Sequence, residues 1–387
     1  MQRRQSRYAA AIAIGLLAVL VKPASSQIAI SANDGKGVLV DGVNTVPDNP
    51  APDNVSIIDL NVNPPKVIAE ITMPTSLVGP PQSVAIAPDK SFALVTAATK
   101  IDPANKKKTV PENKLSVIDL KAKPPVVIAT LETGAGASGV ALNKAATLAI
   151  VANRVEGTLS VFTVAGNKLT PAGKVDLGNP KSGPSAVAFA PDGKSALVTR
   201  DGDNMISILA IDGTKVEVSP RKIYAGLKPY PLGITKDGAW AVTSNVGMGN
   251  GDADTISLID LKAKPPRVVD TIAVGQTPES ISVSPNGRYI AVTVMNGGNK
   301  PRSSPFHTSN GVLAIYAING GKLAKVTEAK SGNWCQGSGW RKDSKLVILQ
   351  CMVEQSITAY AFNGKKLTPA GVIKTKGGPG GLGVSAD

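Results

Sequence analysis

The 387-residue chain has one histidine, His307, and two cysteines, Cys335 and Cys351. One histidine excludes a histidine-rich metal centre. Two separated cysteines leave no paired-cysteine zinc spacing and no Cys-x-x-Cys-His sequence for covalent haem. We therefore expect no metal and no cofactor. Aromatic residues make up only 4% of the chain, so a folded core must be packed from Val, Ile, Leu and Ala.

Long apolar runs are also missing, apart from one near the N-terminus. Residues 9–21 are apolar, follow Arg3, Arg4 and Arg7, and precede a small-residue stretch at 24–26, a pattern typical of a signal peptide. The run is shorter than the roughly 18–20 residues that span a bilayer, although an uncleaved anchor is the alternative. We interpret residues 1–26 as a signal peptide and 27–387 as one periplasmic or secreted domain, with no transmembrane segment after cleavage.

Basic residues outnumber acidic ones even without that segment. Residues 27–387 hold 38 Lys and Arg against 28 Asp and Glu, which favours attraction to anionic surfaces or acidic partners. The lysines are scattered through turns, and the exported address argues against nucleic acid, so we expect no nucleic-acid partner. The sequence does not indicate an oligomeric state.

A strand-like sequence recurs along the chain where helical periodicity is missing. Apolar strands such as VSIIDL, LSVIDL and ISLIDL begin at Val55, Leu115, Leu159, Ile206, Ile256, Leu313 and Ile357. They are separated by 60, 44, 47, 50, 57 and 44 residues, the size of a four-stranded propeller blade with variable loops. The spacing therefore indicates a ring of similar blades.

A hairpin precedes each of these strands, as in AVAFAPDGKSALVT and SISVSPNGRYIAVT, where Asp-Gly or Asn-Gly supplies a tight turn. Counted through its second strand, the pattern occurs seven times and predicts an all-β, seven-bladed β-propeller of four-stranded antiparallel blades. The C-terminal GGPGGLGVSAD matches only a first strand. We predict that it closes the ring by completing the blade of residues 38–73. QIAISANDGK, near Gln27, also resembles a first strand and is the alternative for that place.

The repeat resembles the YVTN-type propeller repeats of bacterial surface-layer-like proteins and of seven-bladed lactonase-like propellers. This resemblance covers the chain from residue 27 onward and rests on Pro-x-x-Val-Ala-x-x-Pro-Asp-Gly-Lys followed by Val-Ser-Val-Ile-Asp-Leu. It implies the fold but not one activity, because such propellers include hydrolases, isomerases and proteins without chemistry. Propeller lactonases generally use His, Glu and Arg at the channel mouth. Here only His307 is available, in an expected loop, which departs from that pattern.

Alignment of the repeats predicts a polar ring at one mouth of the channel. First strands contribute Gln82, Ser138, Ser185, Tyr230, Glu279, Gln336 and Gly380, and the ends of second strands contribute Asp41, Asn153, Arg154, Arg200, Asp201, Asn245, Asn296 and Gln350. Glu279 is the candidate general base, with Arg200 and Arg154 as catalytic partners that hold a carboxylate or stabilise an oxyanion. The candidate ligand-binding residues are Asp41, Gln82, Tyr230, Asn245, Asn296 and Gln336. The alternative is that these side chains satisfy one another and channel waters.

The sequence also predicts long loops, a candidate cation site and a disulfide. We expect long loops at 41–54, 99–113, 245–254 and 295–310, the last with Lys300, Arg302 and His307 as possible contacts for an anionic partner. Asp252 and Asp254 are an alternative calcium site whose spacing fits no standard calcium loop. Cys335 and Cys351 flank the turn of the last hairpin, one register step from direct opposition, and a cross-strand disulfide is predicted, with two buried thiols as the alternative.

Two functions follow from these observations. The first is an exported binding module that presents its loop face to a partner protein, an anionic glycan or a small polar ligand. The second is a lactone hydrolase or isomerase that acts at the channel mouth through Glu279, Arg200 and Arg154. An electron-transfer scaffold is disfavoured, because the sequence has no haem-attachment motif.

Overall fold

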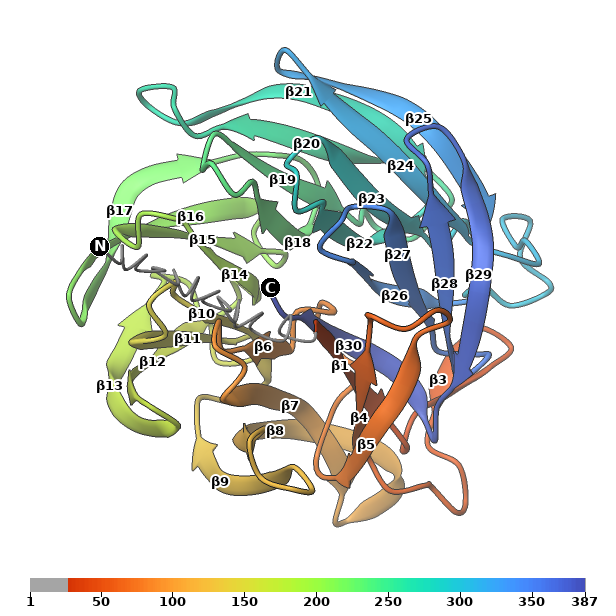
Figure 1. Cartoon of the computed structure of the whole chain (residues 1–387), viewed down its shortest axis with the longest axis horizontal. Helices are drawn as coiled ribbons and strands as arrows, with labels where there is room; N and C mark the ends of the chain where they lie inside the picture. The colour runs from red at the N-terminus through yellow and green to blue at the C-terminus, as the bar shows by residue number, and fades with distance from the viewer. Residues whose placement is uncertain (1–26, 387) are drawn as a thin grey trace, which may run out of the picture.

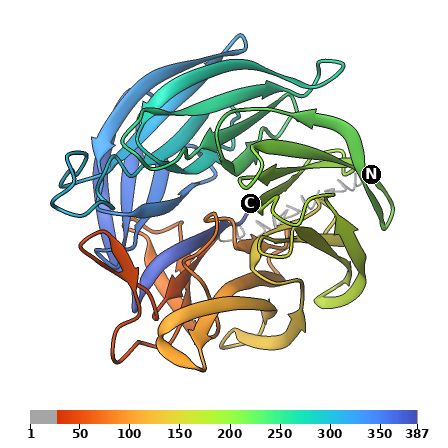
Figure 2. The same cartoon turned by 180° about the vertical axis from the view of Figure 1, so that it is seen from behind.

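The structure, a computed structural model, describes residues 27–386. These residues form seven four-stranded antiparallel sheets and one two-stranded sheet, and the seven larger sheets stand as blades around a central axis (Figures 1 and 2). The predicted seven-bladed β-propeller is confirmed. The predicted signal peptide, residues 1–26, lies outside the described part of the chain. Within residues 27–386, no helix has the length and apolarity that a membrane span requires.

Each blade is described from its innermost strand outward. Blade 1 consists of β30 (Gly378–Val384), β1 (Ile28–Asp34), β4 (Asn54–Asp59) and β5 (Lys66–Thr72); blade 2 of β6 (Val84–Ile86), β7 (Phe92–Asp102), β8 (Asn105–Asp119) and β9 (Val126–Glu132). Blade 3 consists of β10 (Ala137–Leu142), β11 (Leu148–Asn153), β12 (Thr158–Ala165) and β13 (Lys168–Asp176); blade 4 of β14 (Pro184–Phe189), β15 (Ser195–Arg200), β16 (Met205–Asp212) and β17 (Lys215–Ile223).

The remaining blades follow the same order. Blade 5 consists of β18 (Pro229–Ile234), β19 (Trp240–Asn245), β20 (Asp254–Asp260) and β21 (Arg267–Gly275); blade 6 of β22 (Pro278–Val283), β23 (Tyr289–Val294), β24 (Val312–Asn319) and β25 (Lys322–Lys330). Blade 7 consists of β26 (Cys335–Trp340), β27 (Leu346–Cys351), β28 (Ser356–Phe362) and β29 (Leu367–Lys374), and β2 (Val38–Val40) pairs with β3 (Val43–Thr45) in the small sheet. The recurring apolar strands of the sequence are the third strands of the blades.

Ring closure joins the two ends of the described chain. β30 takes the innermost place of blade 1 and pairs antiparallel with β1, with Ser31 opposite Leu382 (Figure 1). The predicted closure by the C-terminal strand is therefore confirmed. The assignment of residues 38–40 to the second strand of that blade is wrong. β1 holds that place, and residues 38–45 form a separate hairpin that pairs only with itself.

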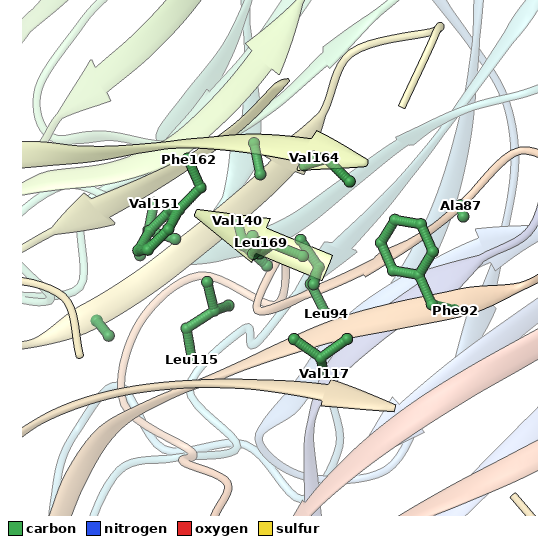
Figure 3. Close-up of a cluster of buried hydrophobic side chains, with 12 residues drawn as sticks. Ala87, Phe92, Leu94, Leu115, Val117, Val140, Val151, Phe162, Val164 and Leu169 are labelled. Atoms are coloured by element: carbon green, nitrogen blue, oxygen red, sulfur yellow. The ribbon is translucent and has the colours of Figure 1, made fainter. Parts of the chain in front are cut away.

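Apolar side chains fill the spaces between blades. Between blades 2 and 3, Phe92 and Leu115 from one side meet Val140, Val151 and Phe162 from the other in a fully buried cluster (Figure 3). A single blade leaves both faces of its sheet exposed, so each blade depends on its neighbours to bury them. Most of the buried apolar residues are Val, Ile, Leu and Ala, as the low aromatic content of the sequence predicts.

The two ends of the ring differ in their connections. We call the end with the links from second to third strands, and from each blade to the next, the loop face. The opposite end, where innermost strands turn into second strands, is the turn face. The predicted loop at 99–113 is wrong in part, because β7 and β8 continue as a paired hairpin to Asp102 and Asn105. Residues 246–253 and 295–311 do form loops at the loop face.

Candidate functional site

The link between blades 1 and 2 enters the central channel. Within it, Leu77 is buried, and the Gly79 backbone N–H hydrogen-bonds to the Tyr230 hydroxyl. Farther along, the Gln82 side chain reaches from blade 2 to blade 5, where its Nε2 donates to the Leu232 carbonyl at 2.6 Å and its Oε1 accepts from the Leu232 N–H at 2.9 Å. These two hydrogen bonds join blade 2 to blade 5 across the channel.

A cavity of about 260 Å³ remains at the loop face, beside this link. Its charged and aromatic lining comes from four neighbouring blades, with Arg154 from blade 3, Asp201 from blade 4, Tyr230 from blade 5 and Glu279 from blade 6. Lys228 and residues 246–249 complete one side. A cavity of this size suits a small polar ligand.

Arg154 is held between a carboxylate and an aromatic ring. Its Nη2 forms an ion pair with Asp201 Oδ2, and its guanidinium carbon lies 5.8 Å from the centroid of the Tyr230 ring. Burial opposes the charge, but Tyr230, Asp201 and Glu279 outweigh it and raise the pKa of Arg154. Its Nε is buried and has no hydrogen-bond partner among residues 27–386, whereas the side chain as a whole is 33% exposed.

Glu279 is one of two buried carboxyls of this cavity, with 8% of its surface exposed, beside Asp201 with 7%. Burial is the largest influence and raises its pKa, and the charge of Asp201 acts in the same direction. Arg154 and a hydrogen bond of 3.3 Å from Gln336 Nε2 act against them, and the result is a pKa of about 7. A carboxyl with that pKa exchanges a proton readily at neutral pH, as a general base must.

Two predicted site residues serve their own blades instead. Arg200 is 1% exposed, binds Asp203 through an ion pair, and donates from Nη1 to Ser207 Oγ at 3.1 Å. Asn245 donates from Nδ2 to Ser257 Oγ at 3.1 Å. The same contact joins Asn33 to Ser56 and Asn153 to Ser160. The end of the second strand is thus a position that ties the second strand to the third, so the predicted grouping of Arg200 with Glu279 is not seen.

The other predicted ligand-binding residues are dispersed. Asp41 is exposed in the β2–β3 turn, where its Oδ1 accepts the Arg302 N–H at 2.8 Å, so its placement at the end of a second strand is wrong. Asn296 begins the loop of blade 6 in the left-handed region, with φ of 50°. Gln82 is committed to Leu232. Of the predicted set, the structure brings together Glu279, Arg154, Tyr230 and Gln336.

Lys228 and Thr277 are residues of the cavity that the sequence alignment missed. Each directly precedes an innermost strand, where blades 3 and 4 have Gly136 and Gly183. All four positions have positive φ, with 54° at both Lys228 and Thr277. A β-branched residue in this region is strained, and such strain concentrates at functional sites. The sequence signal is a Lys-Pro or Thr-Pro where blades 3 and 4 carry glycine.

The candidate cation and anion contacts of the loops have other partners. Asp254 Oδ2 accepts the Thr277 N–H at 2.8 Å. Lys300 Nζ donates to the Gly249 carbonyl, and the Nδ1 of the half-buried His307 lies 3.1 Å from the Lys300 carbonyl oxygen. In the part of the chain that the structure describes, no three His, Cys, Asp or Glu residues group as metal ligands.

Comparison with known proteins gives the fold. The chain matches no protein-family model and no curated protein. A proposed 6-phosphogluconolactonase from Bacteroides uniformis superposes with a TM-score of 0.72 at 17% identity, over 93% of this chain and 100% of that one. A periplasmic gluconolactonase from Pseudomonas aeruginosa gives 0.69 at 14%, over 93% and 99%. Hydrazine synthase from Kuenenia stuttgartiensis gives 0.62 at 18%, over 80% and 91%.

These superpositions show that the chain shares its propeller architecture with lactonase-like proteins, and at such low identity they show the fold alone. The YVTN-repeat resemblance stays a prediction, because no family model matches. The same architecture in hydrazine synthase illustrates that the fold does not determine one chemistry. Any function for this chain must therefore be argued from the side chains of its own cavity.

Proposed function

We propose that the protein hydrolyses a small polar lactone in the loop-face cavity and works outside the cytoplasm. The observation that carries this proposal is that a buried carboxyl, Glu279, and the guanidinium-bearing Arg154 line one cavity. The fold shared with a periplasmic gluconolactonase supports the reaction class. The disulfide between Cys335 and Cys351 supports an oxidising compartment.

The chemistry needs one base and one donor. Ionised Glu279 accepts a proton from a water molecule while the water oxygen attacks the lactone carbonyl carbon. The guanidinium of Arg154 donates to the oxygen on which negative charge develops. The ring C–O bond then breaks, Glu279 returns its proton to the departing alkoxide oxygen, and a hydroxy acid leaves. Asp201 keeps Arg154 in place through their ion pair.

Titration of released acid on a panel of sugar and acyl lactones tests this proposal. We expect Glu279→Gln to lower the enzymatic rate by about 10²–10⁴-fold, since it removes the base. Arg154→Met should cost roughly 10²-fold. Glu132→Gln is the matched control, because that side chain is 74% exposed on β9 and should leave the rate unchanged. Folded wild-type protein without turnover on any lactone would contradict the proposal.

A non-catalytic binding module is the second candidate. It is favoured by the partners that Arg154 and Glu279 already have, Asp201 and Gln336, which give a preformed polar site. The exposed apolar residues Met248 and Phe306 on the surrounding loops, 60% and 44% exposed, fit contact with a partner protein, an anionic glycan or a small polar ligand. Calorimetry separates the two functions, because a module binds lactones or sugar acids without converting them.

A further inference from the structure

A second and larger cavity lies at the opposite end of the channel. It has a volume of about 750 Å³ and opens on the turn face. Gln82 and Leu232, whose paired hydrogen bonds cross the channel, both line it. Neither residue lines the loop-face cavity that contains Glu279. The turn-face cavity takes no part in the proposed hydrolysis.

The wall of this cavity is apolar and is built from one repeated position. The last residue of the innermost strand lines the cavity in six of the blades: Leu142, Phe189, Ile234, Val283, Trp340 and Val384. Five of these side chains are half-buried, and Trp340 is 3% exposed. The innermost strands of these six blades are thus apolar where they end, at the turn face. An apolar wall binds an apolar body.

The rim of the same cavity is cationic. Lys144, Lys236 and Lys342 come from the turns of blades 3, 5 and 7, and all three are exposed. The rim carboxylate Asp343 is paired with Arg341, with Nη2 and Oδ2 2.8 Å apart. An unbalanced positive rim around an apolar wall is complementary to a molecule with one anionic group on an apolar body.

We infer that the turn face holds a second binding site, for a small amphipathic anion such as an aromatic or aliphatic carboxylate or sulfonate. The apolar body lies against the ends of the innermost strands, and the anionic group lies at the lysine rim. Gln82 and Leu232 form the floor and keep this ligand apart from the Glu279 cavity. The inference does not depend on lactone hydrolysis.

Anilinonaphthalene sulfonate is a suitable probe, because it joins an apolar ring system to one anion and fluoresces when bound. We expect one probe molecule per full-length chain. Val283→Glu should weaken binding by about tenfold or more, since it places a like charge on the apolar wall. Val372→Glu is the matched control, because Val372 is 60% exposed on the outermost strand β29 and should leave affinity unchanged.

A second set of variants tests the rim without touching buried residues, so it applies even where Val283→Glu does not fold. The triple change Lys144→Gln, Lys236→Gln and Lys342→Gln should weaken binding by several fold and reduce its salt dependence. The same changes at the exposed residues Lys66, Lys168 and Lys365, outside this cavity, should not. Neutral phenylnaphthylamine should bind more weakly than the sulfonate.

Glu279→Gln distinguishes the two cavities. It should abolish lactone turnover and leave the affinity for the probe unchanged, so that failure of one proposal does not decide the other. The inference is overturned if Glu279→Gln weakens probe binding as Val283→Glu does. It is also overturned if Val283→Glu and Val372→Glu, both folded, bind the probe with equal affinity. The same holds if the triple lysine variant of the rim and the control triple variant bind the probe with equal affinity.

Discussion

Glu279 shows how a single buried group links the site to stability. Its carboxyl is covered on all but 8% of its surface and has a carboxylate neighbour in Asp201. The folded protein therefore holds the Glu279 proton up to a pH of about 7, whereas an exposed glutamate releases it near 4.5. Ionisation above that pH is opposed by burial, so the charged base is available only at a cost in folding free energy.

Replacement of this carboxyl should change how stability depends on pH. The Glu279 pKa is raised on folding, so its contribution is complete below about pH 4.5 and is lost as the pH rises through about 7. Glu279→Gln removes that loss. Between pH 5 and 8, its free energy of unfolding relative to that of wild type should therefore rise by on the order of 2–3 kcal/mol. Urea unfolding at a series of pH values measures this. Parallel profiles for the two proteins would contradict the raised pKa, and Glu132→Gln should follow wild type.

The sequence predicted the site residues on the innermost strands. It did not predict which residues at the ends of the second strands face the site. Tyr230, Glu279 and Gln336 each stand second in an innermost strand, so the repeat alignment predicted them as neighbours. Tyr230 and Glu279 line one cavity, and Gln336 donates to Glu279. Residues that end second strands turn toward the third strand of their own blade, as Asn245 does toward Ser257. A repeat alignment gives the position of a residue along a strand. It does not give the hydrogen bond that decides where a polar side chain points.

At the scale of elements, β-bulges make the observed strand register differ from the register that the sequence predicts. The innermost strands of blades 3 to 7 each shift register near their first residues. In blade 7 the shift lies between Gln336 and Ser338, at Gly337 with φ of 66°. It brings Cys335 directly opposite Cys351, so the disulfide is confirmed and the predicted one-step offset is wrong. The offset came from counting residues, which does not show a bulge.

This disulfide should stabilise the blade beside the ring closure. Both cysteines are buried and lie 16 residues apart, and a cross-link over such a short span is worth about 2–4 kcal/mol. We expect Cys335→Ala with Cys351→Ala to lower the free energy of unfolding by that amount. Reduction of the wild type should produce a similar loss in denaturant unfolding, and a reductant should leave the double variant unchanged. Equal stability of oxidised wild type and double variant would contradict a structural role.

At the scale of the whole molecule, the repeat predicted the number of blades and the closing strand because each blade depends on both neighbours. It did not predict the second strand of blade 1, because residues 28–34 resemble a first strand when read alone. Their hydrogen bonds place them in the second strand of blade 1, because Asn33 Nδ2 donates to Ser56 Oγ just as Asn153 Nδ2 donates to Ser160 Oγ in blade 3. Two ends of one chain can compete for one blade, and only pairing between distant segments assigns them.

Closure by β30 should therefore decide whether the ring folds as one unit. Truncation after Lys376 removes the innermost strand of blade 1, exposes the edge of β1, and takes Leu382 from a buried cluster with Ile58 and Ile348. Open edges expose unpaired backbone groups, so we expect a larger hydrodynamic radius and non-cooperative unfolding. A peptide of residues 377–387 should restore compactness by strand addition. Deletion of residues 38–45, a hairpin outside the blades, is the control and should keep the ring closed. A truncated protein as compact and cooperative as the intact chain would show that blade 1 is held by its neighbours' side chains alone.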